Sequence, residues 1–352
     1  MPCRADFIEW GYVMIFRNIE FHNVSELTQD SDGSYILHRF PVSVECAMEG
    51  SGAVQNRVAV GVELRFRIGS GSVKLRLRNA GAVGTAARVH QYRGEILDQW
   101  QNYVYTLPGG EEREIVIEPH REPELLRRVS TAAGHAISPD VVRLALNSSS
   151  VRFVGVLGDV LPPRAEDLPK RTYLAYGSSI TNGSHSYSDA VHFVTRVAEH
   201  FHADRRNLGL AGNARLEREV ADEIAAMGER GEWDFATLCL GINISGIAAE
   251  EFRRKVRYML LCVTEKNPDK HVFAISPIYS KDDMLGKSNL DRFREVVAEE
   301  VARIGAENLH YVSGLDLLGG AHGLSGDFVH PTPNGADEIA KNLIQAISKY
   351  VK

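Results

Sequence analysis

The sequence contains little cysteine, and its cysteines are far apart. Four occur among the 352 residues, at positions 3, 46, 239 and 262, and no two of them form a C-x-x-C pair. A disulfide framework needs several closely spaced cysteines in a short chain, and a zinc ribbon needs paired ones. Neither a disulfide-stabilised scaffold nor a zinc ribbon is therefore indicated.

Long apolar runs and an excess of basic charge are also missing. No stretch approaches the roughly 18 consecutive apolar residues that span a bilayer, and the first residues lack the basic start and apolar middle of a secretory signal. Forty Lys and Arg against 46 Asp and Glu give a formal net charge of −6, whereas a general nucleic-acid-binding surface is positive. We therefore expect a cytoplasmic protein that binds neither nucleic acid nor membrane, with homo-oligomerisation left open.

The first half of the chain has the hydrophobic pattern of β-strands. Residues 62–68 and 73–78 both alternate apolar and charged side chains, with Gly-Ser-Gly-Ser between them, which predicts a hairpin of two antiparallel strands. Further strands are expected at residues 102–107, 114–118, 141–146 and 151–160. Many short strands and few helical patterns predict an antiparallel β-sandwich, of the jelly-roll kind, over residues 1–160.

The second half has the pattern of an α/β domain. Residues 161–170 contain three prolines and several charges, so we interpret them as a linker. Beyond them, over residues 171–352, apolar strands at 172–176, 206–210, 235–240, 271–276 and 309–312 alternate with amphipathic helical stretches at 190–201, 214–227, 248–266, 288–305 and 334–350. Such alternation predicts a doubly wound sheet of five parallel strands with helices on both faces.

Polar residues follow the predicted strands of this domain at the points where ligands bind. Ser179 follows the first strand, Gly212 the second and Asn243 the third, while Asp327 and His330 precede the last helix. Ligands of doubly wound sheets lie at the carboxyl ends of the strands. A serine is a weak nucleophile unless a base such as histidine takes its proton, and a carboxylate can orient that histidine. These residue types therefore point to acyl transfer through a serine.

The same residues resemble the motifs of the SGNH (GDSL-type) hydrolase family. Gly177-Ser178-Ser179 matches the G-D-S block, Gly212 the second-block glycine, Asn243 the G-x-N-D asparagine, and Asp327 with His330 the D-x-x-H block; the match extends over about residues 171–350. The family is known for a flavodoxin-like three-layer α/β/α domain, which the resemblance implies here. It also implies a catalytic triad of Ser179, His330 and Asp327. The oxyanion hole would consist of the backbone N–H groups of Ser179 and Gly212 and the side chain of Asn243.

Two positions depart from the family pattern. Ser178 and Ile244 stand where the family has aspartates, which puts the subclass in doubt. Ser178 is also a rival candidate for the nucleophile. The Gly177–Thr181 block, Gly-Ser-Ser-Ile-Thr, joined to an N-terminal β-sandwich resembles a two-domain bacterial subgroup that includes sugar-ester deacetylases and a natural-product acyltransferase.

We therefore expect a serine esterase that hydrolyses small acyl esters, acetyl above all, of a carbohydrate or related polyol. The substrate class follows from the subgroup resemblance alone. We expect no cofactor and no catalytic metal, because His322 is not part of an H-E-x-x-H motif. One alternative is an acyltransferase that uses the same site with an alcohol acceptor. Another is a catalytically inactive glycan-binding protein, for which Trp100, Tyr103 and Tyr105 are the candidate stacking residues.

The sequence also offers candidates for lining a substrate pocket. They lie in or near the predicted strand-end loops and are Tyr176, Asn182, His185 and Tyr279.

Overall fold

A computed structural model describes residues 13–98, 104–147, 149–183, 191–286 and 289–352, which form two compact units. The first unit takes the chain up to Val42 and then Asn56–Lys170. The second takes Ser43–Gln55 and Arg171–Lys352. The short segment Ser43–Gln55 thus belongs with the second unit, although the hydrophobic pattern groups it with the first half of the chain.

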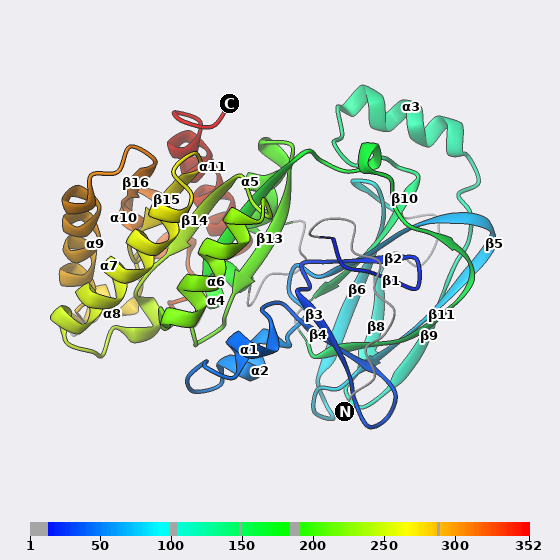
Figure 1. The fold of residues 1–352 in the computed structure, drawn as a ribbon, viewed down its shortest axis with the longest axis horizontal. Coiled ribbons are helices and arrows are strands. Elements are labelled where there is room, and N and C mark those ends of the chain that lie inside the picture. Colours follow the sequence, from blue (N-terminus) through cyan, green and yellow to red (C-terminus); the bar gives the residue numbers. More distant parts are fainter. Residues whose placement is uncertain (1–12, 99–103, 148, 184–190, 287–288) are drawn as a thin grey trace. The chain divides into compact units, whose positions relative to one another are not determined.

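Eleven strands of the first unit are hydrogen-bonded into one antiparallel sheet (Figure 1). They are β1 (Ile15–Phe16), β2 (Ile19–His22), β3 (Glu26–Gln29), β4 (Tyr35–His38), β5 (Glu63–Asn79), β6 (Ala86–Arg93), β7 (Ile96–Leu97), β8 (Val104–Pro108), β9 (Glu112–Ile117), β10 (Val141–Asn147) and β11 (Val151–Leu161). Apolar side chains from most of these strands, including Phe21, Leu64 and Phe153, meet in a single buried core. The predicted antiparallel β domain is confirmed.

β5 stands where the sequence predicted a hairpin, and that prediction was wrong. The two alternating runs are halves of one 17-residue strand; the first half pairs with β10 and the second with β9. Between them the register with β11 is irregular, with Asp159 opposite Ser70. The buried apolar positions also change there from even numbers (Leu64) to odd ones (Leu75). Bulges shift alternation and bend strands, so the Gly-Ser-Gly-Ser stretch bends one strand instead of reversing the chain.

Charged side chains are buried in pairs on the first unit's sheet. Glu63 is fully buried, and its Oε2 accepts hydrogen bonds from the Nε atoms of Arg65 and Arg143, both at 2.7 Å. Arg143 also donates to the backbone oxygen of Gly94 at 2.8 Å. Removing a charge from water is costly unless partners satisfy it, so these contacts hold three neighbouring strand segments in one register.

The second unit is a five-stranded parallel sheet in the order β13-β12-β14-β15-β16. The strands are β12 (Arg171–Gly177), β13 (Ala203–Gly209), β14 (Phe235–Cys239), β15 (His271–Ile275) and β16 (Leu309–Val312). Helices α6 (Arg218–Glu229), α7 (Ala249–Lys266) and α9 (Leu290–Ile304) pack side by side, and α5 (Phe193–His200) packs on α11 (Pro333–Ile347) (Figure 1). The predicted flavodoxin-like α/β/α arrangement with five parallel strands is confirmed.

The helices fall into a longer and a shorter group. The longer ones are α3 (Pro123–Ala133) in the first unit and α5 (Phe193–His200), α6 (Arg218–Glu229), α7 (Ala249–Lys266), α9 (Leu290–Ile304) and α11 (Pro333–Ile347) in the second. The short ones are α1 (Val42–Glu45), α2 (Gly52–Asn56), α4 (Ser179–Asn182), α8 (Lys281–Leu285) and α10 (Gly314–Leu317), with 3-10 turns at Ala165–Asp167, Ile242–Ile244 and Ala321–Gly323.

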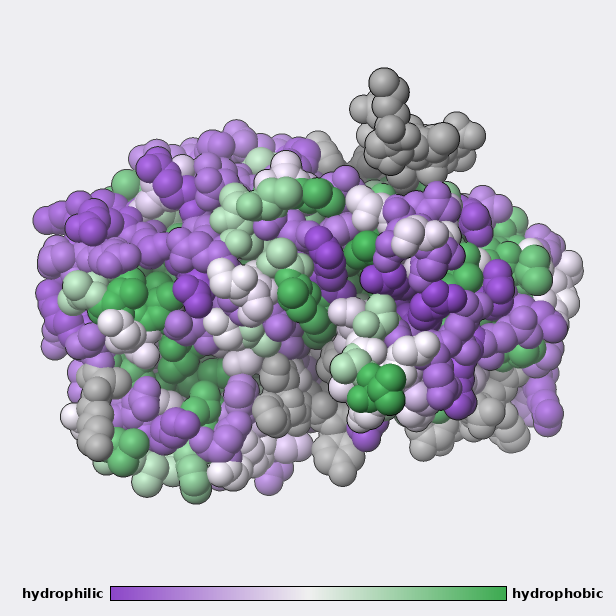
Figure 2. All heavy atoms as spheres, turned by 90° about the horizontal axis from the view of Figure 1, so that it is seen from below, coloured by the Kyte–Doolittle hydropathy of each residue, from purple (hydrophilic) through white to green (hydrophobic). Residues whose placement is uncertain are grey.

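The surface is largely hydrophilic on the face shown in Figure 2, where apolar residues gather in small separate groups. Among the helices of the described residues, none is both long enough and apolar enough to cross a membrane.

We expect Arg143→Met to lower the free energy of unfolding by about 3–5 kcal/mol, because it leaves the buried Glu63 carboxylate without one of its charged partners. The matched control is Arg76→Met, which breaks an ion pair with Glu112 whose arginine is 49% exposed and should cost no more than about 1 kcal/mol. Urea unfolding followed by circular dichroism measures both. Equal effects of the two substitutions would contradict a structural role for the buried pair.

Candidate active site

Ser179 lies where β12, the first strand of the second unit in sequence, is followed by a short helix. β12 pairs with β13 on one side and β14 on the other, and Ser179 is the first residue of α4. The preceding Ser178 is buried, and its hydroxyl accepts a hydrogen bond from the backbone N–H of Ile180 at 3.2 Å. Ser178 therefore caps the helix, which leaves Ser179 as the half-buried hydroxyl at this strand end.

The structure brings Ser179, His330 and Asp327 together in one hydrogen-bonded chain. His330 Nε2 lies 2.8 Å from Ser179 Oγ, and His330 Nδ1 lies 2.6 Å from Asp327 Oδ2. With Nδ1–H donated to the carboxylate, Nε2 has the lone pair that accepts the serine proton. This is the arrangement in which a histidine can act as the general base for a serine nucleophile.

The loop that carries Asp327 and His330 is closed on itself. The backbone N–H of Ser325 donates to the backbone oxygen of His330 at 2.7 Å, and that of Phe328 donates to Ser325 at 2.9 Å. Phe328 has a φ of +60°, in the left-handed region that bulky side chains seldom adopt. The tight loop thus places Asp327 and His330, three residues apart, in direct contact.

Hydrogen bonds keep Asp327 charged. Partial burial disfavours the carboxylate form, but the backbone N–H and ring of His330, the N–H of Val329 and the Ser325 hydroxyl outweigh this effect. Together they hold the pKa of Asp327 well below its usual range. Asp327 can therefore stabilise a protonated His330 without taking up the proton itself.

Gly212 and Asn243 follow the strands on either side of β12. Gly212 lies beyond β13 with a φ of +68°, and Asn243 lies in the 3-10 turn Ile242–Ile244 beyond β14. The Asn243 Oδ1 accepts a hydrogen bond from the backbone N–H of Ala214 at 3.0 Å. That bond ties the Gly212 loop to Asn243 and fixes which end of the amide serves as acceptor, so the other end is available as a donor.

A buried carboxyl lies just beyond this loop and was not singled out from the sequence. Glu217 is buried, and its Oε1 accepts a hydrogen bond from the backbone N–H of Glu49 at 3.3 Å. Burial raises the pKa of the Glu217 carboxyl, against the lowering effect of that N–H and of Lys255. Nothing near residue 217 in the sequence indicates this environment, because the partner is 168 residues away.

The predicted pocket-lining residues have mainly structural contacts. Tyr176 is fully buried, and its hydroxyl accepts a hydrogen bond from the backbone N–H of Leu216 at 3.3 Å. Asn182 is buried and donates to the backbone oxygen of Gly209 at 3.2 Å. Tyr279 packs against the apolar core of the second unit, and His185 lies outside the described residues. These contacts indicate that Tyr176 and Asn182 support the strand ends from within.

The aromatic residues proposed for glycan stacking can be placed only in part. Trp100 and Tyr103 lie outside the described residues. Tyr105 packs against the first unit's core, and its hydroxyl donates to Gln91 Oε1 at 2.9 Å. His322 contacts Glu338 at 2.8 Å on the surface.

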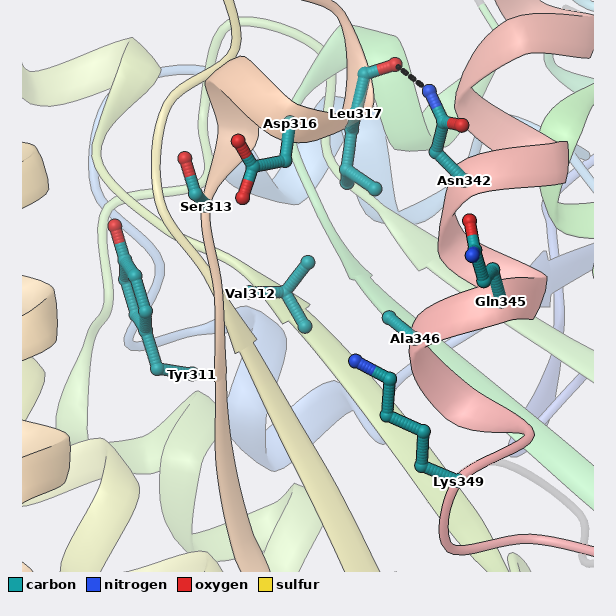
Figure 3. A pocket seen from close by; sticks show the side chains of 9 residues that line it. All are labelled: Tyr311, Val312, Ser313, Asp316, Leu317, Asn342, Gln345, Ala346 and Lys349. Carbon is teal, nitrogen blue, oxygen red and sulfur yellow. Dashed lines mark hydrogen bonds between the residues drawn. The ribbon is translucent and has the colours of Figure 1, made fainter.

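A separate cavity of about 320 Å³ lies between β16, α10 and α11 (Figure 3). Polar side chains line this cavity, among them Tyr311, Asp316, Asn342 and Lys349. None of the predicted site residues lines this cavity, so it is distinct from the Ser179 site.

Residues 175–337 match the model of the GDSL-like Lipase/Acylhydrolase family. A comparison with curated proteins gives no match. Among solved structures, the chain is similar to the salicylyl-acyltransferase SsfX3 from a tetracycline biosynthetic pathway, with a TM-score of 0.75 and 19% identity over 96% of this chain and 97% of that one.

Two carbohydrate esterases are also similar in fold. For the family two carbohydrate esterase from Cellvibrio japonicus, the TM-score is 0.60 and the identity 11%, over 94% of this chain and 95% of that one. For a family two carbohydrate esterase from Clostridium thermocellum in complex with cellohexaose, the values are 0.56 and 16%, over 82% and 91%. All three structural neighbours share the fold of this chain over nearly their full length.

Because its pKa is raised on folding, Glu217 should make stability depend on pH. A carboxyl that binds protons more tightly in the folded chain lowers the free energy of unfolding as pH rises from its ordinary pKa through the raised value. We expect Glu217→Gln, which keeps the acceptor for Glu49, to gain stability relative to wild type over this interval. Urea unfolding from about pH 4 to pH 8 measures the difference. Glu219→Gln, on the exposed surface of α6, controls for the loss of one negative charge, and the same trend in that variant would contradict the assignment.

Proposed function

We propose that this chain, whose residues 175–337 form a GDSL-like lipase/acylhydrolase domain, is a serine esterase that removes small acyl groups, acetyl above all, from a carbohydrate or related polyol. The observation that carries the proposal is the continuous hydrogen-bonded chain from Asp327 through His330 to Ser179. Ser179 and His330 are 151 residues apart in the sequence. Their contact therefore depends on the position of the β12 end and on that of the loop that carries His330.

In the proposed reaction, Ser179 Oγ attacks the carbonyl carbon of the ester while His330 Nε2 takes the hydroxyl proton. The tetrahedral intermediate collapses when the bond to the alcohol oxygen breaks and His330 returns the proton to that oxygen. Water then attacks the acyl-serine, again losing a proton to His330, and the carboxylic acid leaves as Ser179 regains its hydrogen. General base catalysis of this kind contributes about 10²–10⁴-fold.

The negative oxygen of each intermediate needs hydrogen-bond donors already in place. We assign this role to the backbone N–H groups of Ser179 and Gly212 and to the side-chain amide of Asn243. Support comes from the Ala214 N–H, which occupies the Asn243 oxygen and so leaves the amide nitrogen as the donor. Each such donor is typically worth about 3–4 kcal/mol of barrier.

The proposed substrate class is supported by the structural neighbours and by one block of the sequence. Both carbohydrate esterases described above belong to family two, and one of them is in complex with cellohexaose. This agrees with the resemblance of the Gly177–Thr181 block to sugar-ester deacetylases. Acetylated sugars are therefore the substrates to screen once an ester-cleaving activity is measured.

The first experiment compares hydrolysis of p-nitrophenyl acetate with that of longer-chain esters by wild type, Ser179→Ala and Ser178→Ala. We expect acetate to be preferred and Ser179→Ala to lower kcat by on the order of 10⁶. Ser178→Ala is the matched control, since it loses a helix cap worth about 0.5–2 kcal/mol of stability and should keep the activity. Undiminished turnover by Ser179→Ala would refute the mechanism. A folded wild type that retains sugars on an affinity gel without cleaving esters would instead be a glycan-binding protein.

Acyl transfer to an alcohol is the second candidate function, favoured by the salicylyl-acyltransferase among the neighbours. The two functions differ in what attacks the acyl-serine, and exclusion of water from the site favours transfer. For the esterase we expect the acid to remain the main product when an alcohol acceptor is added in excess. Chromatographic measurement of acid and new ester decides between them: an ester product that exceeds the acid at millimolar acceptor would establish transfer.

A further inference from the structure

The segment Ser43–Gln55 comes from the N-terminal half of the chain but is part of the second unit. Its flanks are tied together within the first unit. There the Asn56 side chain accepts from the backbone N–H of Phe40 at 2.7 Å and donates to the Phe40 oxygen at 3.0 Å. Between these flanks the chain leaves the β domain, forms α1 and α2 in turn, and returns.

The turn between α1 and α2 is bound to the loop that carries Gly212. Asn213 Oδ1 accepts from the backbone N–H of Ser51 at 3.1 Å, and Asn213 Nδ2 donates to Ser51 Oγ at 2.7 Å. A second tie joins the backbone N–H of Glu49 to Glu217 at 3.3 Å. Residues 49–51 therefore hold the chain that follows Gly212 at two points, Asn213 and Glu217.

Gly50 shows how closely the two segments approach. Its φ is +60°, and a Cβ atom built on it would lie 2.9 Å from Asn213 Oδ1. A side chain here would therefore push Asn213 away. Gly71 has nearly the same φ, +63°, but no atom of the described residues would lie within 4 Å of its Cβ.

Gly212 itself is exposed and has no side chain with which to fix its own position. Its backbone N–H points where the neighbouring peptides direct it. The Asn213 side chain, which is bound to Ser51, also donates from Nδ2 to the backbone oxygen of Ala211 at 3.0 Å. That oxygen belongs to the peptide that carries the Gly212 N–H. Donors that stabilise an oxyanion are effective because they are fixed before the reaction begins, so the direction of this N–H depends on residues 49–51.

We infer that residues 49–51 of the N-terminal half are positioning residues, which hold the Gly212 N–H in the direction required for oxyanion stabilisation through Asn213. This inference rests on the proposed function. By this inference, three residues of the N-terminal half contribute to catalysis by positioning a backbone donor of the second unit.

Steady-state kinetics on the full-length chain tests the inference with Ser51→Ala, Ser51→Thr and Gly50→Ala. Loss of the single Ser51 Oγ hydrogen bond should lower kcat by about 2- to 10-fold with KM unchanged, because the donor matters in the transition state. Ser51→Thr keeps the hydroxyl and should restore kcat. Gly50→Ala should lower kcat at least as much as Ser51→Ala does.

Gly71→Ala is the matched control for Gly50→Ala, since it places the same methyl group on a left-handed backbone without reaching Asn213. It should leave kcat at the wild-type value. Unchanged kcat in Ser51→Ala and Gly50→Ala, or an equal loss in Gly71→Ala, would overturn the inference. If Ser179→Ala abolishes turnover while the residue 50 and 51 variants stay active, the positioning role fails and the proposed function stands. Turnover that survives Ser179→Ala overturns the proposed function itself.

Discussion

The hydrogen bond between Ser179 Oγ and His330 Nε2 joins two segments that are 151 residues apart in the sequence. It forms only if β12 ends where the helix capped by Ser178 begins, and if the closed loop Ser325–His330 holds the imidazole within hydrogen-bond distance of Ser179. The parallel sheet meets the first condition by aligning β12 with both neighbours. The loop meets the second at the expense of a left-handed Phe328. Strain of this kind persists where the surrounding structure requires the conformation.

Much of this arrangement can be predicted from the sequence, because it depends on local periodicity. Strands β12, β14, β15 and β16 and helices α7, α9 and α11 lie within a few residues of their predicted bounds. In each, a run of apolar side chains has the spacing of its element. Parallel strands end at the same edge of the sheet, which brings residues far apart in sequence to one place, and the resemblance to the family motifs identified the candidate triad among them. Its catalytic role stays a prediction.

The features that the sequence did not predict depend on distant partners. The bend in β5 is one: a Gly-rich stretch between alternating runs is equally consistent with a turn, and only pairing with β9, β10 and β11 distinguishes the two. Helix α3, by contrast, had a readable signal, with Pro123 at its start and a left-handed Gly134 at its end. Charged residues that alternate with apolar ones are typical of a strand face exposed to water, whereas Glu63 is buried with Arg65 and Arg143 as its partners.

The contact between Ser51 and Asn213 has a consequence for the order in which the chain is made. The two residues are 162 positions apart, so at about 5–20 residues per second the ribosome adds Asn213 roughly 10–30 s after Ser51. For most of that interval the β domain is still incomplete, because β11, which pairs with β5, ends at Leu161. During all of it the turn at residues 49–51 has no binding site on the chain already synthesised. The second unit is therefore complete only when residues 49–51, made early, bind the loop at Asn213, made later. A delay in translation between the two halves would lengthen the exposure of this segment without changing the final fold.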